Sequence, residues 1–174
     1  PETWHALMTA LTEVTIDYLT EQVRAGADAV QLFDSWLGLL DPVTYADRVL
    51  PYTRRIFAAI APMTPSIHFS TGTVPLLRQI GTSGCTAVSV DWRLAIDEAW
   101  RLLGPDIGIQ GNLDPALLLA PWAAVELATR DIMGRIKGRP GHIFNLGHGI
   151  IPQTNPDTLA QVVRLLHELG QVNE

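Results

Sequence analysis

The sequence predicts an α/β protein whose five βα units are typical of a (β/α)8 TIM barrel. Five short apolar segments, near residues 29–34, 66–70, 86–91, 107–111 and 142–147, alternate with segments of helical periodicity. Most of these segments end in Asp, Asn, Ser or His. Polar residues at successive strand ends are typical of barrels whose active sites lie at that face. No Gly-x-Gly-x-x-Gly follows any strand, which argues against a dinucleotide-binding sheet.

Composition limits the classes of function. The 174 residues are 47% hydrophobic and 17% charged, so we expect one globular domain over residues 1–174. The net charge is −6 without a block of Lys or Arg, which argues against nucleic-acid and anionic-membrane partners. No apolar run is long enough to span a bilayer. Cys85 is the only cysteine, so no internal disulfide can form and a reducing, cytoplasmic location fits best.

The first two units carry clear helix signals. Leu7, Leu11, Val14 and Tyr18 recur at helical spacing before Gly26. The strand that follows ends in Asp34-Ser35. Asp41-Pro42 is a helix-capping pair, and Pro51 divides the next helical segment into two pieces. Val49, Tyr52, Ile56 and Ile60 form its apolar face.

The remaining strands also end in polar residues. The strand ends are Ser70-Thr71-Gly72, Asp91-Trp92 and Gly111-Asn112-Leu113-Asp114. Asp114 precedes Pro115 and reads as a helix N-cap. After the last strand, Gly147-His148-Gly149 places an imidazole between two residues that permit tight turns. Asn155-Pro156 then begins an amphipathic helix.

Five strands cannot close an eight-stranded barrel. Either three units precede Pro1 or the sheet is open. The first residue is Pro rather than Met, and it runs directly into a helical pattern. We therefore expect the sequence to be a piece of a longer protein.

Four motifs resemble, in order and spacing, the C-terminal half of uroporphyrinogen decarboxylase, over roughly Leu7 to His167. They are Gln31-Leu-Phe-Asp-Ser35, Val90-Asp-Trp92, Gln110-Gly-Asn-Leu-Asp-Pro115 and Asn145-Leu-Gly-His-Gly149. The resemblance implies a cofactor-free, homodimeric (β/α)8 barrel enzyme, to which this chain supplies about the last five βα units as a partial barrel. Its activity would be the conversion of uroporphyrinogen III to coproporphyrinogen III, by removal of four acetate carboxyl groups, in heme biosynthesis.

The resemblance also implies roles for particular residues. Ser35 and His148 match substrate-contacting residues, and Phe33 matches a residue lining the cleft. The family's essential aspartate, its arginine-rich motif and the tyrosine of its middle motif have no match and would lie before Pro1. The catalytic residues are therefore not encoded here, and we expect the chain alone to be inactive.

Two rival classes remain open. A related family, the corrinoid-to-thiol methyltransferases, binds zinc through His-x-Cys and a later Cys, whereas this chain has His68-Phe69-Ser70 and His148. With the thiolate ligands absent, we expect no metal. The second rival is a non-catalytic relative that only binds tetrapyrroles or another chain. Asp91 is expected to orient neighbouring groups or pack at the rim, and Cys85 to be a buried apolar residue.

Overall fold

A computed structural model describes residues 2–170. Five strands form one parallel sheet in the order β1-β2-β3-β4-β5, so the five predicted strands and their parallel pairing are confirmed. The strands are β1 (Val30–Phe33), β2 (Ser66–Phe69), β3 (Ala87–Ser89), β4 (Gly108–Gln110) and β5 (His142–Ile143). Each is shorter than predicted, and β5 most of all, with two residues where 142–147 was expected. Beyond β5, a single bridge between Leu113 and Leu146 continues the pairing.

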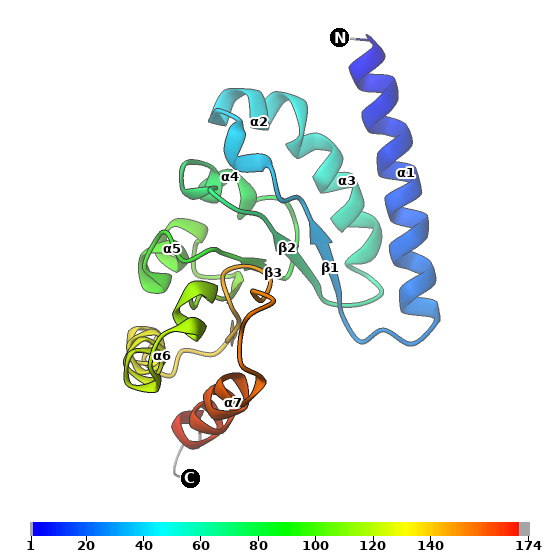
Figure 1. Ribbon diagram of the computed structural model, residues 1–174. Helices are drawn as coiled ribbons and strands as arrows, with labels where there is room; N and C mark the ends of the chain where they lie inside the picture. Colours follow the sequence, from blue (N-terminus) through cyan, green and yellow to red (C-terminus); the bar gives the residue numbers. More distant parts are fainter. Residues whose placement is uncertain (1, 171–174) are drawn as a thin grey trace.

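The helices form an arc outside the sheet, open between α1 and α7 (Figure 1). This arrangement is part of a (β/α)8 barrel, as predicted. The α-helices are α1 (Glu2–Arg24), α2 (Pro42–Arg48), α3 (Leu50–Ile60), α4 (Leu77–Ile80), α5 (Ile96–Leu103), α6 (Trp122–Ile136) and α7 (Pro156–Gly170). Short 3-10 helices lie at η1 (Leu37–Leu39), η2 (Val74–Leu76) and η3 (Pro115–Leu119).

The capping residues read from the sequence are confirmed by hydrogen bonds. Asp41 Oδ1 accepts from the backbone N–H groups of Val43 and Thr44 at 2.9 and 3.0 Å. Asp114 Oδ1 accepts from Ala116 N at 2.9 Å, and Asn155 Oδ1 from Asp157 N at 2.9 Å. Each cap satisfies N–H groups that have no partner within the helix. These caps start three helical segments directly after the polar loops that follow the strands.

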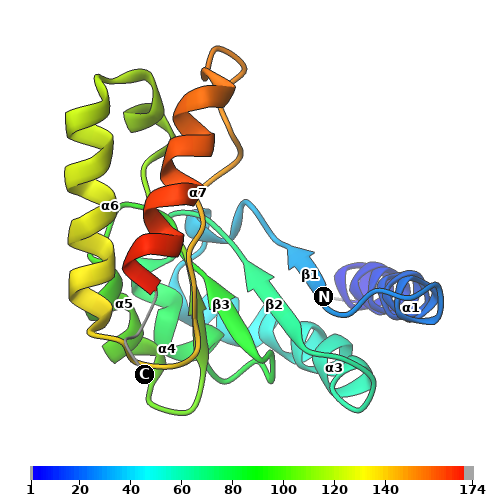
Figure 2. The same cartoon turned by 90° about the horizontal axis from the view of Figure 1, so that it is seen from below.

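The main core lies between the sheet and the helices. Alternate strand residues such as Val88 and Ile109 point outward and are buried against the helices. The predicted apolar face of α3 is buried as well, and each such side chain stabilises the fold by about 1.5–3 kcal/mol. Figure 2 shows the strands between α1 at one end and the helices α6 and α7 at the other. The opposite, inward face of the sheet is the one that positions the site.

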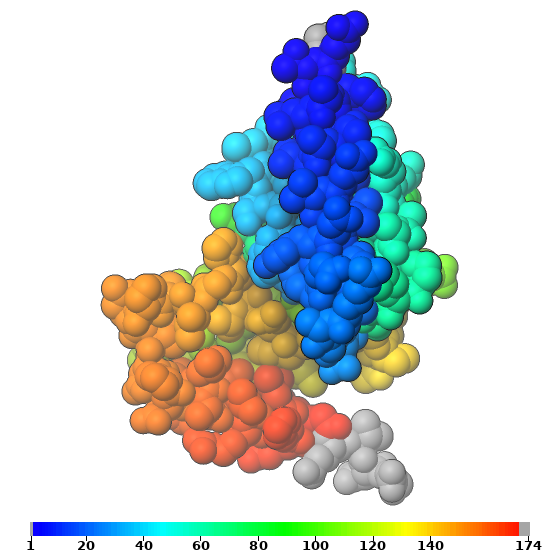
Figure 3. Space-filling view, turned by 90° about the vertical axis from the view of Figure 1, so that its right-hand side faces the viewer, coloured from blue at the N-terminus to red at the C-terminus, as the bar shows by residue number. Residues whose placement is uncertain are grey.

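Helix α1 departs from the pattern that its sequence suggests. It buries Thr12 and Leu19, whereas its apolar stripe is exposed: Leu7 by 52%, Leu11 by 51% and Tyr18 by 66%. Figure 3 shows α1 lying along the surface of the molecule for much of its length. Helical spacing identifies residues that share a face, but it does not tell whether this chain supplies a neighbour for that face.

Candidate active site

A cavity of about 550 Å³ opens where the strands end. It is lined by Gln31, Phe33, Ser35, Phe69, Ser89, Gln110, Asn145, Leu146, His148, Gly149, Ile150 and Leu159. All five strand ends contribute because parallel strands bring their carboxyl ends to one edge. The three residues singled out from the sequence, Phe33, Ser35 and His148, therefore share one cavity.

His148 projects from the loop after β5 and is exposed. Its Nδ1 accepts a hydrogen bond from Gly149 N at 2.7 Å, so the proton of the neutral ring lies on Nε2. The ring packs edge-on against Phe69, with centroids 5.8 Å apart. This geometry leaves an N–H donor directed away from the loop backbone, suited to an anionic oxygen.

Phe33 and Ser35 line the cavity at its β1 end. Phe33 packs against Phe69 with ring centroids 5.4 Å apart, so three rings line one side of the cavity in sequence from β1 to the β5 loop. Ser35 lies in the turn after β1, and its carbonyl accepts from Thr71 Oγ1 at 2.7 Å. The wall thus combines an apolar surface with one hydroxyl.

The floor of the cavity is polar, which the sequence analysis missed. Gln110 Nε2 donates to Gln31 Oε1 at 3.1 Å and to Ser89 Oγ at 3.0 Å. Alternation along the strands was the available signal: Gln31 stands two residues before Phe33 and must share its face. Gln31 and Gln110 each begin one of the four family motifs, but the sequence analysis did not assign them to the site.

Gly147 and Gly149 differ from their expected role. Neither has a positive φ, so turn geometry does not require glycine at either position. A Cβ on Gly147 would lie 2.7 Å from Trp92 N and 2.9 Å from Trp92 Cε3, whereas one on Gly149 would meet nothing within 4 Å. Gly147 is required for close packing of the His148 loop against the end of β3.

A family model described as uroporphyrinogen decarboxylase (URO-D) matches residues 1–169. The chain belongs to the uroporphyrinogen decarboxylase family. It is 48% identical over 170 residues to a uroporphyrinogen decarboxylase of Salinispora tropica, covering 97% of this chain and 46% of that relative. It is 49% identical to one of Nocardia farcinica, covering 97% of this chain and 49% of the relative.

The chain spans about half the length of the curated relatives it matches. Among solved structures, a methyltransferase from Methanosarcina mazei superposes with a TM-score of 0.80 at 20% sequence identity. The superposition covers 90% of this chain and 47% of that chain. At this identity the likeness shows the fold alone.

The lining of the cavity is uncharged. None of the residues that line the cavity is Asp, Glu, Lys or Arg. Asp34, next to Ser35, instead borders a groove of about 240 Å³ between β1, α1 and α3. Burial raises the pKa of Asp34 to about 6. Ser35 therefore lines the cavity, whereas Asp34 lines the separate groove beside α1.

His68 lies on the other side of the sheet from His148. It is fully buried, its ring packs against Phe57 on α3 at 5.4 Å, and it does not line the cavity. Neither ring nitrogen has a hydrogen-bond partner among the described residues, and burial lowers the pKa of His68 to about 4. The two histidines compared with zinc ligands therefore do not meet. Over residues 2–170, no three His, Cys, Asp or Glu side chains converge.

Cys85 is buried, as expected, and burial raises the pKa of its thiol. Within the described part of the chain, no helix is both long and apolar enough for a membrane crossing.

Proposed function

We propose that this chain forms the C-terminal substrate wall of a uroporphyrinogen decarboxylase, acting on uroporphyrinogen III in heme biosynthesis. The observation that carries the proposal is the meeting of Phe33, Ser35 and His148 in one cavity of a chain that belongs to this family. The reaction removes the four acetate carboxyl groups in turn and gives coproporphyrinogen III. The proposed reaction uses no cofactor.

The chemistry defines what a complete site must supply. A proton first reaches the ring carbon beside an acetate, and the cationic pyrrole then accepts the electron pair of the breaking C–C bond as CO2 leaves. The resulting methylene carbon takes up a proton to become methyl, and the ring carbon releases its own. Each cycle consumes one proton and releases one CO2. The site must therefore stabilise a cation and hold several carboxylates.

This chain supplies orientation. His148 Nε2–H donates a hydrogen bond to a substrate carboxylate, and the ring is held by the Gly149 N–H and by Phe69. The Ser35 hydroxyl contacts a second polar group of the substrate, while Phe33 and Phe69 contact the pyrrole faces. The amide and hydroxyl groups of Gln31, Gln110 and Ser89 form a neutral floor.

The charged groups must come from elsewhere, because the cavity lining holds none. We infer that the N-terminal half of such a decarboxylase brings the aspartate and the arginines. The relatives are about twice as long as the part matched here, which leaves room for the three missing units. The isolated chain is then inactive.

The same half would cover the exposed side of α1. The groove there is lined by apolar residues including Met8, Leu11 and Leu32, and β1 pairs only with β2 among the described strands. A strand added beside β1 would satisfy its free backbone edge, and a helix over Leu7 and Leu11 would bury the exposed stripe. We propose that the N-terminal half occupies this groove.

We further propose that the assembled enzyme is a cytoplasmic homodimer. The family resemblance supports the dimer, and the single, buried Cys85 agrees with a reducing compartment. Light scattering of the assembled protein tests the dimer: a mass of two assembled barrels supports it, and a mass of one contradicts it.

The role of His148 is tested by fusing the chain to the N-terminal half of the Salinispora tropica relative. Changing His148→Ala should lower kcat/KM for uroporphyrinogen about tenfold to a hundredfold, and His148→Asn should lose less because the amide still donates. Equal kcat/KM for both variants and the parent would remove His148 from the site. Tetrapyrrole binding without turnover by the parent fusion would instead favour a non-catalytic binder.

A further inference from the structure

Asp91 is a buried carboxylate outside the cavity lining. It follows β3, is 6% exposed, and accepts three hydrogen bonds. Two come from Arg93, whose N lies 3.0 Å from Oδ1 and whose Nη1 lies 2.7 Å from Oδ2. The third comes from Gly72 N, 2.6 Å from Oδ2, on the loop after β2. A buried carboxylate is costly unless its oxygens are satisfied, so these three donors hold it in place.

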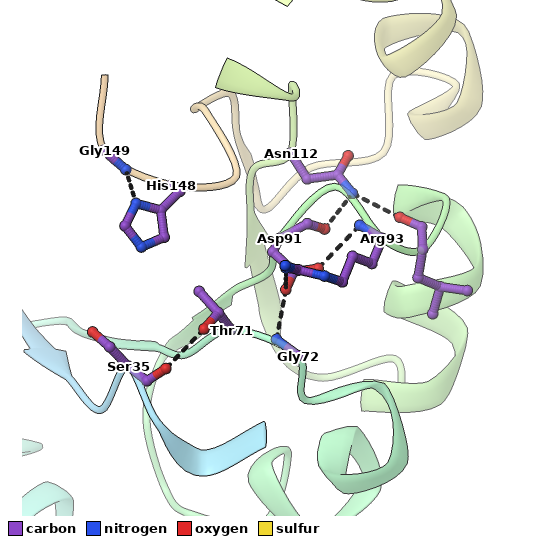
Figure 4. Close-up of polar contacts among 9 residues, drawn as sticks. Ser35, Thr71, Gly72, Asp91, Arg93, Asn112, His148 and Gly149 are labelled. Atoms are coloured by element: carbon purple, nitrogen blue, oxygen red, sulfur yellow. Dashed lines mark hydrogen bonds and ion pairs between the residues drawn. The ribbon is translucent and has the colours of Figure 1, made fainter. Parts of the chain in front are cut away.

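On one side, the loop that Asp91 holds reaches Ser35. Thr71 Oγ1 donates to the Ser35 carbonyl at 2.7 Å, one residue from the Gly72 N–H that Asp91 accepts. The two loops also touch directly, because a Cβ on Gly38 would lie 2.5 Å from Thr71 O and 2.8 Å from Gly72 O. Figure 4 shows the path from Ser35 through Thr71 and Gly72 to Asp91.

On the other side, the backbone at Asp91 reaches His148. Asn112 Nδ2 donates to Asp91 O at 2.9 Å and to Leu94 O at 2.7 Å. The next residue, Leu113, accepts from Gly147 N at 2.7 Å. A Cβ on Gly147 would lie 3.1 Å from the carbonyl carbon of Asp91, so the His148 loop packs on this backbone.

We propose that Asp91 is a positioning residue that fixes Ser35 relative to His148 across the cavity, through the Gly72–Thr71 loop on one side and the Gly147 contact on the other. The proposal rests on the function proposed above. Asp91 touches no residue of the cavity through its carboxylate, so it acts on the substrate only through these two loops. Its side chain binds the loop that contacts Ser35, and its backbone packs against the loop that carries His148.

Removal of the carboxylate should therefore affect the Ser35 side of the cavity more than the His148 side. In Asp91→Asn the side chain keeps its size but carries an NH2 group in place of one of the two accepting oxygens, so at least one of the three donors loses its partner. The Gly72–Thr71 loop is then free to move, and Ser35 with it. Thr71→Val deletes the next hydrogen bond in the same path while keeping the side-chain shape. Asp91→Asn and Thr71→Val interrupt one path at two points.

The kinetic test uses the fusion with the Salinispora tropica N-terminal half. Each single variant should lower kcat/KM for uroporphyrinogen by about tenfold to a hundredfold. Most of the loss should lie in kcat, with rates normalised to the folded fraction. The double variant should be hardly worse than the worse single variant, because residues in one path are not additive. Asp114→Asn, another strand-end Asp that only caps a helix, is the matched control and should retain the parent's rate.

Histidine-ring NMR supplies a readout independent of turnover. The His148 signals, assigned with His148→Gln, should shift less in Asp91→Asn than amide signals of residues 35–38 and 71–72, because the β5 loop is held by backbone contacts. Rates of Asp91→Asn and Thr71→Val within twofold of the parent, or losses that simply multiply, would overturn the proposal. If the parent fusion shows no decarboxylation, the proposed function is wrong. Unchanged amide signals at residues 35–38 in both variants would separately overturn the positioning role of Asp91.

Discussion

Gly147 offers a sharp test of how rigidly the His148 loop is held. In Gly147→Ala, the new Cβ would lie 2.7 Å from Trp92 N, about 0.7 Å inside the 3.4 Å at which ordinary contact begins. Neither side yields easily: Gly147 N is bonded to Leu113 O at 2.7 Å, and the Trp92 backbone follows the anchored Asp91. We expect the loop to move outward by a substantial part of an ångström. Overpacking of this kind costs about 1–3 kcal/mol.

The assay combines urea unfolding and coproporphyrinogen formation by the fused protein. Gly147→Ala should lose about 1–3 kcal/mol of stability and at least about tenfold in kcat/KM, since His148 moves with the loop. Gly149→Ala is the matched control for stability: its Cβ meets nothing within 4 Å and its φ suits alanine, so its unfolding free energy should stay within about 0.5 kcal/mol of the parent. If Gly147→Ala matched the parent in both stability and rate, the packing account of the loop would be wrong.

Two further predictions concern burial and assembly. The pKa of His68 is lowered to about 4 by burial, so as pH falls from about 6.5 the unfolded state takes up a proton that the folded state refuses. This group alone should therefore lower the unfolding free energy by about 2 kcal/mol between pH 7 and pH 5. In urea unfolding of the fusion, His68→Leu should remove this part of the dependence of the unfolding free energy on pH. The control variant His167→Gln, at an exposed position, should retain it. An unchanged slope in His68→Leu would refute the assignment. Leu11→Glu, on the exposed stripe of α1, should weaken association with a separately produced N-terminal half by about tenfold or more in calorimetry, while Leu127→Glu, 72% exposed on α6, should not. Equal weakening by both would place the contact elsewhere than the α1 groove.

Most of the fold was predictable because each strand is short, apolar and followed by polar residues. Strand positions and helix caps at Asp41, Asp114 and Asn155 depend on local chemistry that a single sequence displays. The orientation of α1 did not follow, since periodicity cannot tell whether a neighbouring unit is present. The parallel order needed the βα alternation, which only the whole chain shows.

The site was predictable in part. The Gly-His-Gly loop and the strand-end serine pointed to His148 and Ser35, which share the cavity with Phe33. Gln31, Ser89 and Gln110 were missed because their strands were read as apolar and the inward face was not separated from the outward one. The steric need for Gly147 and the bonds of Asp91 depend on contacts between distant loops, which no local pattern encodes.

The central claim is that this chain contributes a substrate wall that works only with an N-terminal half. The direct measurement is coproporphyrinogen formation from uroporphyrinogen III by four samples: this chain, the N-terminal half of the Salinispora tropica relative, the two mixed, and the two fused. We expect no product from either part alone and product from the fusion, with the mixture active in proportion to the complex formed. Product from residues 1–174 alone would contradict the account, and so would a correctly folded fusion that binds uroporphyrinogen but releases no CO2.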